Sequence, residues 1–396
     1  MENLFYELFA ASIQDGYIGN LIDIVNAAGG EKRLYDMTEA DLEDKLMLTP
    51  KMAEHIINRR NCFDYDKTIK IMADNSIDFV RYSDKKYPAR LRRIQSRPYG
   101  LFIKGSLPGD EVPSVAIVGA RNCSQYGRLM AEYFGDRLAR HKVNVISGMA
   151  YGIDGISQMA AIDAGGSSYG ILGCGVDIVY PASNRRLYER LVKNGGVISE
   201  YLPGTGALAR NFPPRNRIIS GLCDVLLVVE ARAKSGTLIT VDLAIEQNKE
   251  VMVVPGRITD PLSVGCLNLM KAGASPALCI EDVLEELNNP PEKVSAKADD
   301  FSEGELKAEE LEEIKRKKEI IKNAFKNKPE KTKKEGIPLS EEEERVYRAM
   351  DYYPKNIEAI ARESSLPVTR VLAAATSLEL KGLINALSQS TFLKNS

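Results

Sequence analysis

Short apolar runs rich in β-branched residues alternate with longer amphipathic stretches through the middle of the chain. Buried parallel strands read as continuous apolar runs, and the intervening segments have helical length and period. The alternation therefore predicts a doubly wound α/β domain with a mostly parallel sheet. We place this domain at residues 76–287, with lead-in strands between 76 and 111. The runs that predict its main strands are 114–119, 143–147, 167–173, 196–200, 224–230 and 251–256.

The chain before this domain has apolar positions at helical spacing, interrupted by Gly29, Gly30 and Pro50. This pattern predicts short helices, and we assign residues 1–75 to a small helical, SAM-like domain. A helix-hairpin-helix that grips DNA phosphates is one interpretation of such a segment. A packing or interaction module is the interpretation we favour, because the hairpin glycines are not at clear spacing.

The chain after the α/β domain changes composition twice. Residues 288–338 are rich in Pro, Glu and Lys, which predicts a charged linker. Residues 339–396 regain helical periodicity, with Ser340 placed to cap a helix, Pro367 near a helix start and Gly382 at a helix end. Three short helices and a strand-like tail predict a winged-helix-like domain.

The expected recognition helix of this last domain, residues 367–381, has Arg370 and Lys381 as its only basic residues. Winged-helix DNA readers carry basic and polar side chains on that helix. Partner binding or dimerisation is therefore at least as consistent with the sequence as DNA reading.

Composition removes several functional classes. The chain has six cysteines without a CxxC pair, and two histidines, which leaves little for a metal centre or a Ser-His-Asp triad. We expect reduced thiols, no metal and no cofactor. No run of 18 apolar residues occurs and the start lacks a basic leader, so we expect a cytoplasmic protein without a membrane partner. The net charge of −2 means that anion binding must come from local placement of cations.

The residues that follow the predicted strands carry the candidate chemistry, because ligands of open α/β sheets bind beyond the carboxyl ends of the strands. Gly119 and Arg121 follow the first strand, and Ser147 and Gly148 follow the second. Glycine lets the backbone approach an anion, and arginine adds a fixed charge. The turn after the first strand is not GxGxxG, and GxxxxGK[ST] occurs nowhere, which disfavours a nucleotide triphosphatase.

The segment NFPPRNRIISG, residues 211–221, places an aromatic ring and arginines directly before the fifth strand. Its prolines stiffen the backbone, so Phe212, Arg215 and Arg217 lose little freedom on binding a partner. One edge of the sheet thus gathers basic residues without an obvious acidic counter-set. These residues are Arg121, Arg210, Arg215, Arg217, Lys234, Arg257 and Lys271.

A positive groove beside an aromatic ring is how proteins hold single-stranded nucleic acid, with phosphates paired to cations and bases stacked on rings. Phe212 and Tyr201 are the candidate stacking residues. A core position for Phe212 is an equal alternative.

The sequence resembles the bacterial DNA processing protein A family (DprA, also called Smf). The resemblance covers about residues 80–285, and the FPxRNRIIxG block at 212–221 is specific to that family. The segments that carry it, in order, are SVAIVGAR, ISGMAYGID, GCGVDIVYPASN, SEYLPG, FPPRNRIISG, VVEARAKSGTLIT, VVPGR and LMKAGA. Ala120 stands where many members have serine, which removes one hydroxyl donor from that turn.

The resemblance implies a Rossmann-like, non-catalytic protein that binds and protects incoming single-stranded DNA and loads the recombinase RecA onto it in natural transformation. It also implies a homodimer formed through the Rossmann-like domain. Together with the strand-end analysis, it predicts eleven DNA-binding residues: Gly119, Arg121, Ser147, Gly148, Arg210, Phe212, Arg215, Asn216, Arg217, Lys234 and Lys271.

Two alternatives stay open at this point. One is a nucleotide-processing hydrolase on a related Rossmann-like sheet, such as a phosphoribohydrolase. The PGGxGTxxE signature of those enzymes is absent, and KSGTLIT followed by Asp242 and Glu246 resembles it only faintly. The other is a structural scaffold whose terminal domains carry the function.

Overall fold

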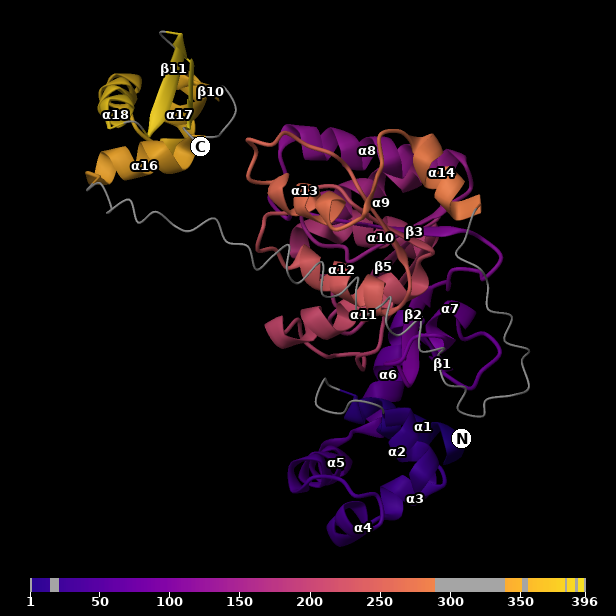
Figure 1. The fold of residues 1–396 in the computed structure, drawn as a ribbon. Helices are drawn as coiled ribbons and strands as arrows, with labels where there is room; N and C mark the ends of the chain where they lie inside the picture. The colour runs from indigo at the N-terminus through magenta and orange to yellow at the C-terminus, as the bar shows by residue number, and fades with distance from the viewer. Residues whose placement is uncertain are drawn as a thin grey trace. The chain divides into compact units, whose positions relative to one another are not determined.

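The computed structural model describes residues 2–14, 21–288, 339–350, 355–381, 383–388 and 391–394, which fall into two compact units (Figure 1). The first unit holds the N-terminal helices and a large sheet, and the second holds the C-terminal helices and a small sheet. Among the described helices, none is long and apolar enough to cross a bilayer. The predicted linker lies almost wholly outside the described residues. The predicted boundary between residues 75 and 76 stays a prediction.

Within the described residues, six helices precede the sheet, as the periodicity of the first 75 residues predicts. Side-chain caps set several of their starts: Thr38 forms a capping box with Asp41, Thr49 precedes Pro50 at the first helical position, and Asp64 caps the last helix. The SAM-like and helix-hairpin-helix interpretations stay predictions. The helices are α1 (Glu2–Ile13), α2 (Leu21–Ala28), α3 (Glu31–Asp36), α4 (Glu39–Asp44), α5 (Pro50–Cys62) and α6 (Tyr65–Asn75).

The large sheet has nine strands in the order β1-β2-β6-β5-β4-β3-β7-β8-β9. Neighbours from β6 through β9 pair in parallel, and β1 and β2 add antiparallel strands beside β6. All six predicted strands form, whereas the two-residue β9 was not predicted. The strands are β1 (Asp78–Arg81), β2 (Gly100–Gly105), β3 (Ser114–Val118), β4 (Asn144–Ser147), β5 (Ser168–Ile171), β6 (Gly195–Ser199), β7 (Val225–Val228), β8 (Glu250–Val253) and β9 (Ser275–Pro276).

Helices cover both faces of this sheet, which confirms the doubly wound, mostly parallel α/β prediction. Figure 1 shows α8 and α14 on one side and α11 and α12 on the other. Phe134 and Leu138 of α8 pack with Val115, Val145 and Leu227 in one buried cluster. The helices are α7 (Ala89–Arg92), α8 (Gln125–Arg140), α9 (Ile153–Asp163), α10 (Arg185–Lys193), α11 (Phe212–Leu222), α12 (Thr237–Glu246), α13 (Val264–Lys271) and α14 (Ile280–Asn288), with short 3₁₀ turns η1 (Ala182–Asn184) and η2 (Ala209–Asn211).

The strand order reverses between β3 and β7. The chain runs outward from β3 through β4 and β5 to β6, then returns through α11 to place β7 on the other side of β3. Such a reversal opens a crevice at the carboxyl edge, where ligands of this architecture bind. The residues that follow β3, β4, β5 and β7 therefore frame the candidate site.

The second unit is the predicted winged-helix-like domain. Its core is built from Val346, Ile360, Val371 and Leu378, all fully buried. Ser340 forms a capping box with Glu343, as predicted for a helix start, whereas Gly382 lies outside the described residues. The elements are α16 (Glu341–Ala349), β10 (Lys355–Asn356), α17 (Ile357–Ser364), α18 (Val368–Leu380), β11 (Ile384–Ser388) and β12 (Thr391–Lys394).

The basic residues of the expected recognition helix are paired with acids of α16. Arg370 forms an ion pair with Glu342, and the Lys381 ammonium lies 2.7 Å from the Glu343 carboxylate. These pairs offset the two positive charges that DNA reading by α18 would use.

Candidate nucleic-acid interface

A small pocket opens at the carboxyl ends of β4 and β5, beside the loop that follows β3. We call it the edge pocket. It brings together four of the predicted residues, Arg121, Gly148, Phe212 and Arg215, from three separate segments of the chain. Its complete lining is Arg121, Gly148, Ala150, Tyr151, Leu172, Gly173, Cys174, Tyr180, Pro181, Phe212 and Arg215.

Arg215 forms the back wall of the edge pocket and is 4% exposed. Its guanidinium donates to the carbonyl of Gly148, at 3.1 Å, and to that of Ile171, so it ties the end of β4 to the end of β5. Burial lowers its pKa to about 10, partly offset by the nearby carboxylate of Asp154, so the group stays charged at neutral pH. A Cβ on Gly148 would lie 2.8 Å from this guanidinium, so a larger residue at this position would collide with Arg215.

Asp154 supports the turn after β4. It is the second residue of α9, and its carboxylate accepts the backbone N–H of Gly148 at 3.0 Å. Burial raises its pKa, an effect opposed by the positive charge of Arg215. Asp154 therefore fixes the backbone against which Arg215 packs.

Arg217 faces away from the edge pocket, into the protein. Its guanidinium lies 2.6 and 2.5 Å from the two carboxylate oxygens of Glu200 and donates to the carbonyl of Ser96 at 2.7 Å. Burial opposes the charged form, but the charge and hydrogen bonds of Glu200, together with two nearby tyrosines, raise the Arg217 pKa. The prediction of arginines without acidic partners is therefore wrong for Arg217, because an acid 17 residues away in sequence pairs with it.

Ser147 and Asn216 also make internal contacts. The Ser147 hydroxyl is fully buried and donates to the carbonyl of Ile117 at 2.6 Å. The Asn216 side-chain oxygen accepts from Nε of Arg215 at 3.2 Å. Neither residue lines the edge pocket, and DNA contact by Ser147, Asn216 or Arg217 stays a prediction.

Arg121 is exposed at the mouth of the edge pocket, on the loop between β3 and α8. Glu230, which follows β7 and is 1% exposed, holds this loop by accepting from the backbone N–H and hydroxyl of Ser124 at 2.9 and 2.5 Å. Ser124 in turn caps α8 through the N–H of Gly127. The reversal of strand order thus places a buried carboxylate under the loop that carries Arg121. Sequence analysis did not single out Glu230.

Aromatic rings surround the same opening. The rings of Tyr180 and Phe212 lie 5.4 Å apart with their planes inclined by 36°, and the Arg215 guanidinium lies 5.7 Å from the Phe212 ring centroid. Tyr151 and Tyr180 are 51% and 45% exposed, so both offer a free ring face. Neither tyrosine was among the residues predicted from the sequence, although each follows shortly after a predicted strand.

Tyr201, a predicted stacking residue, is buried at 3% exposure. Its hydroxyl donates to the carbonyl of Asn211 at 3.2 Å, which joins the two ends of the loop between β6 and α11. The prediction that Tyr201 stacks on a base is therefore wrong, because its ring is part of the protein interior.

The remaining predicted residues lie outside the edge pocket. Arg210 is exposed in η2, two residues before Phe212. Lys234 is exposed before α12, and Lys271 is the exposed last residue of α13. Gly119 is a packing position, because a Cβ there would lie 2.7 Å from Ile153.

The edge pocket offers little to acid–base or nucleophilic chemistry. Its described lining contains no Asp, Glu, His, Lys or hydroxyl other than the phenols. The thiol of Cys174 is buried, and burial raises its pKa to about 11, so it is protonated and poorly nucleophilic at neutral pH. Among the described residues, no group of His, Cys, Asp and Glu is arranged to hold a metal ion. The arrangement suits binding of an anion with planar groups.

Comparisons with known proteins agree with the predicted resemblance. Residues 78–288 match the sequence model of the DNA recombination-mediator protein A family, and residues 330–389 match the DprA winged helix domain. The DNA processing protein DprA of Streptococcus pneumoniae is 42% identical over 203 residues, which span 51% of this chain and 72% of that protein. The DprA of Bacillus subtilis is 37% identical over 227 residues, 56% of this chain and 76% of that protein.

A solved structure supports the same assignment at the level of fold. The X-ray structure of DNA processing protein A from Streptococcus pneumoniae superposes with a TM-score of 0.61 at 33% identity, covering 71% of this chain and 97% of that one. The sheet lies within the matched family domain, and the C-terminal unit matches the winged helix domain up to residue 389. The chain belongs to the DNA recombination-mediator protein A family, whose members include the DprA and Smf proteins.

Proposed function

We propose that this protein binds single-stranded DNA along the carboxyl edge of its sheet. The observation that carries the proposal is the edge pocket itself, where exposed Arg121 stands beside the open ring faces of Tyr151 and Tyr180. A guanidinium pairs with a phosphate, and each ring stacks on a base without regard to its identity. Arg215 lies behind them, and its buried charge draws a phosphate toward the pocket.

The protein acts as a binding module and catalyses no reaction. The lining described above supports this, because a hydrolase acting on nucleotides needs a general base or an activated water near its substrate. The carboxylate of Asp154, behind Gly148 of the pocket wall, is buried and accepts a backbone N–H. The phosphoribohydrolase alternative therefore has no residue in the edge pocket to carry its chemistry.

The bound strand is passed to the recombinase RecA, in the cytoplasm, during the processing of incoming DNA. Membership of a recombination-mediator family supports this role, and a homodimer formed through the sheet domain completes the assembly. The domains are residues 1–75, 76–287 and 339–396, joined by the linker 288–338.

A gel-shift comparison of single- and double-stranded DNA at two salt concentrations tests the proposal. Single-stranded DNA should bind more tightly, and its affinity should fall steeply as salt rises, because phosphate contacts release counterions. Binding that ignores salt, or that prefers the duplex, contradicts it. Incubation with nucleoside monophosphates should release no free base, and clear turnover would restore the enzyme alternative.

RecA loading needs a separate measurement. RecA added to DNA that is already coated with a single-strand-binding protein should form filaments faster when this protein is present. An unchanged rate, with DNA binding intact, would remove the mediator step while leaving the DNA site in place.

A further inference from the structure

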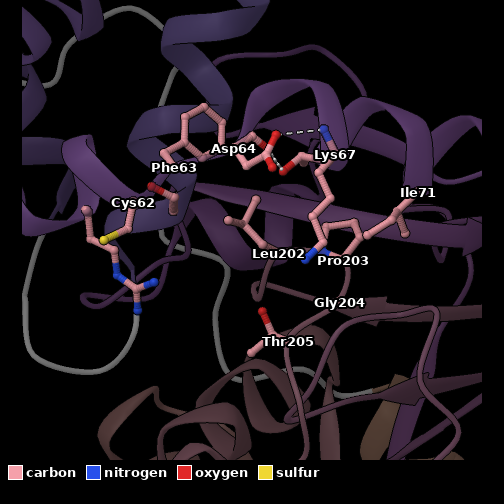
Figure 2. A pocket seen from close by; sticks show the side chains of 12 residues that line it. Cys62, Phe63, Asp64, Lys67, Ile71, Leu202, Pro203, Gly204 and Thr205 are labelled. Carbon is pink, nitrogen blue, oxygen red and sulfur yellow. Dashed lines mark hydrogen bonds between the residues drawn. The ribbon is translucent and has the colours of Figure 1, made fainter.

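A cavity of about 190 Å³ lies between the N-terminal helices and the loop that follows β6. We call it the α6 cavity. Figure 2 shows its two walls, with Asp64, Lys67 and Ile71 on the helical side and residues 202–205 opposite. Both walls belong to the first compact unit. None of the predicted DNA-binding residues lines this cavity.

The lining of the α6 cavity combines apolar walls with positive charge. Phe63, Ile71 and Leu202 supply apolar surface, while Arg59 and exposed Lys67 supply the cations. Asp64 is the acid of the described lining, and its carboxylate accepts the backbone N–H of Lys67 at 2.9 Å as the cap of α6. Flat apolar surface beside cations matches a nucleotide, whose base is planar and whose phosphate is an anion.

The α6 cavity and the edge pocket share a wall. Cys174 lines the edge pocket, and the next residue, Gly175, donates its N–H to the carbonyl of Thr205, which lines the cavity, at 2.9 Å. Gly204 donates its N–H to the carboxylate of Asp177 on the same segment, at 2.9 Å. One pair of hydrogen-bonded loops therefore separates the two hollows.

The order of the strands puts the two hollows on one line. The edge pocket follows β4 and β5, and the α6 cavity follows β6, the next strand of the sheet. Neighbouring strands are about 5 Å apart, so a chain of nucleotides lying along the carboxyl edge passes from one hollow to the other within a few residues of its length.

We propose that the α6 cavity is a second nucleotide subsite of the same DNA strand, with a base against Phe63 and the adjoining phosphate between Arg59 and Lys67. The subsite rests on the proposed single-strand binding. It extends the DNA path from the sheet onto the N-terminal helices, and it gives that helical region a direct role in binding.

Cys62 provides a direct readout, because its exposed side chain lines the α6 cavity. The rate of its alkylation is measured by mass spectrometry on the full-length protein, with Cys279 as the internal control. Oligodeoxythymidine longer than about 16 nucleotides, added at ten times its Kd, should slow the alkylation of Cys62 by about tenfold. A dinucleotide is the matching short oligomer: it is too short to occupy both hollows, so it should bind the edge pocket and leave Cys62 at its free rate.

A matched pair of variants tests the cation. Lys67→Glu should weaken binding of the long oligomer and abolish its protection of Cys62. Binding of the short oligomer should not change. Lys70→Glu, one turn further on α6, exposed and outside the cavity lining, should behave like the unaltered protein.

The outcomes separate the two proposals. If neither oligomer binds, single-strand binding itself is wrong. If the long oligomer binds and Cys62 still reacts at its free rate, the subsite is wrong and single-strand binding stands. If thymidine monophosphate alone protects Cys62 as well as the long oligomer does, the cavity is an independent nucleotide site and the continuous path is wrong.

Discussion

At the scale of single residues, substitutions of Arg121 and Arg217 should have different effects. The first should weaken DNA binding, and the second should lower the stability of the fold. Arg121 is exposed at the mouth of the edge pocket. Arg121→Ala should lower the affinity for single-stranded DNA by about tenfold or more, since a hydrogen bond to a charged group contributes about 1.5–3 kcal/mol. The slope of log K against log salt should fall by about 0.7, the share of one phosphate contact on a single strand. Fluorescence anisotropy across a salt series measures both.

Arg128→Ala is the control for this variant. Arg128 is exposed on α8 and lies 3.9 Å from Glu132, outside the edge pocket. Its removal should leave both affinity and slope unchanged. Equal losses in the two variants would mean that general positive charge, and not the position of Arg121, governs binding.

Arg217→Ala should act on stability. The substitution leaves Glu200, itself 3% exposed, without its ion-pair partner, and breaking a buried pair in this way costs about 3–5 kcal/mol. Urea unfolding measures the loss. The double variant Arg217→Met with Glu200→Leu should recover much of it, because neither position then leaves an unpaired buried charge. A fully stable Arg217→Ala protein with impaired DNA binding would instead place Arg217 in the DNA interface.

At the scale of elements, the loop between β3 and α8 depends on the end of β7. Glu230→Gln keeps the shape of the side chain and removes the charge that holds Ser124. We expect Glu230→Gln to weaken DNA binding, because the loop then no longer holds Arg121 in place. Once Arg121 is replaced by alanine, Glu230→Gln should therefore cause little further loss of affinity in a double-mutant cycle. Additive losses would show that Glu230 acts independently of the loop. Glu132→Gln, exposed on α8, is the control.

The C-terminal unit should lose stability in acid through Glu343. Hydrogen bonds from Lys381, Ser377 and the backbone of Ser340 lower the pKa of this carboxyl from 4.5 to about 2. A lowered pKa means that the charged form stabilises the fold, so the stabilisation is complete above pH 4.5 and is lost as pH falls toward 2. The melting temperature of the C-terminal unit should therefore fall between pH 4.5 and pH 2, and Glu343→Gln should make this fall shallower. An equally steep acid transition in that variant would assign the effect elsewhere.

At the scale of the whole molecule, the ion pairs between α16 and the end of α18 lead us to expect the proposed DNA binding in the first unit. Arg370 and Lys381 each pair with a glutamate, so the second unit offers few unpaired charges along its expected recognition helix. Deletion of residues 339–396 should change the Kd for single-stranded DNA by less than about threefold. A larger loss would favour the scaffold alternative, in which the terminal domains carry the function.

The sequence predicts the sheet well because buried parallel strands are uniformly apolar, a local property that needs no knowledge of neighbours. It predicts the candidate site only in part, because the direction of a side chain depends on distant segments. Arg215 and Arg217 lie two positions apart on α11, yet one lines the edge pocket and the other meets Glu200. Tyr201 and Tyr180 both follow strands, and tertiary packing alone decides which ring is exposed.

The segment between Tyr201 and Asn211 is closed at its base, by the hydrogen bond between these two residues and by the ion pair of Glu200 with Arg217. Its far half is open, since a Cβ on Gly206 would meet no atom within 4 Å. Loop closure depends weakly on length, and doubling the number of residues costs only about 0.6 kcal/mol. The segment can therefore accept added residues near Gly206 without disturbing the anchors at its base, while Gly204 and Thr205 stay bonded to Asp177 and Gly175 and keep the spacing of the two hollows constant.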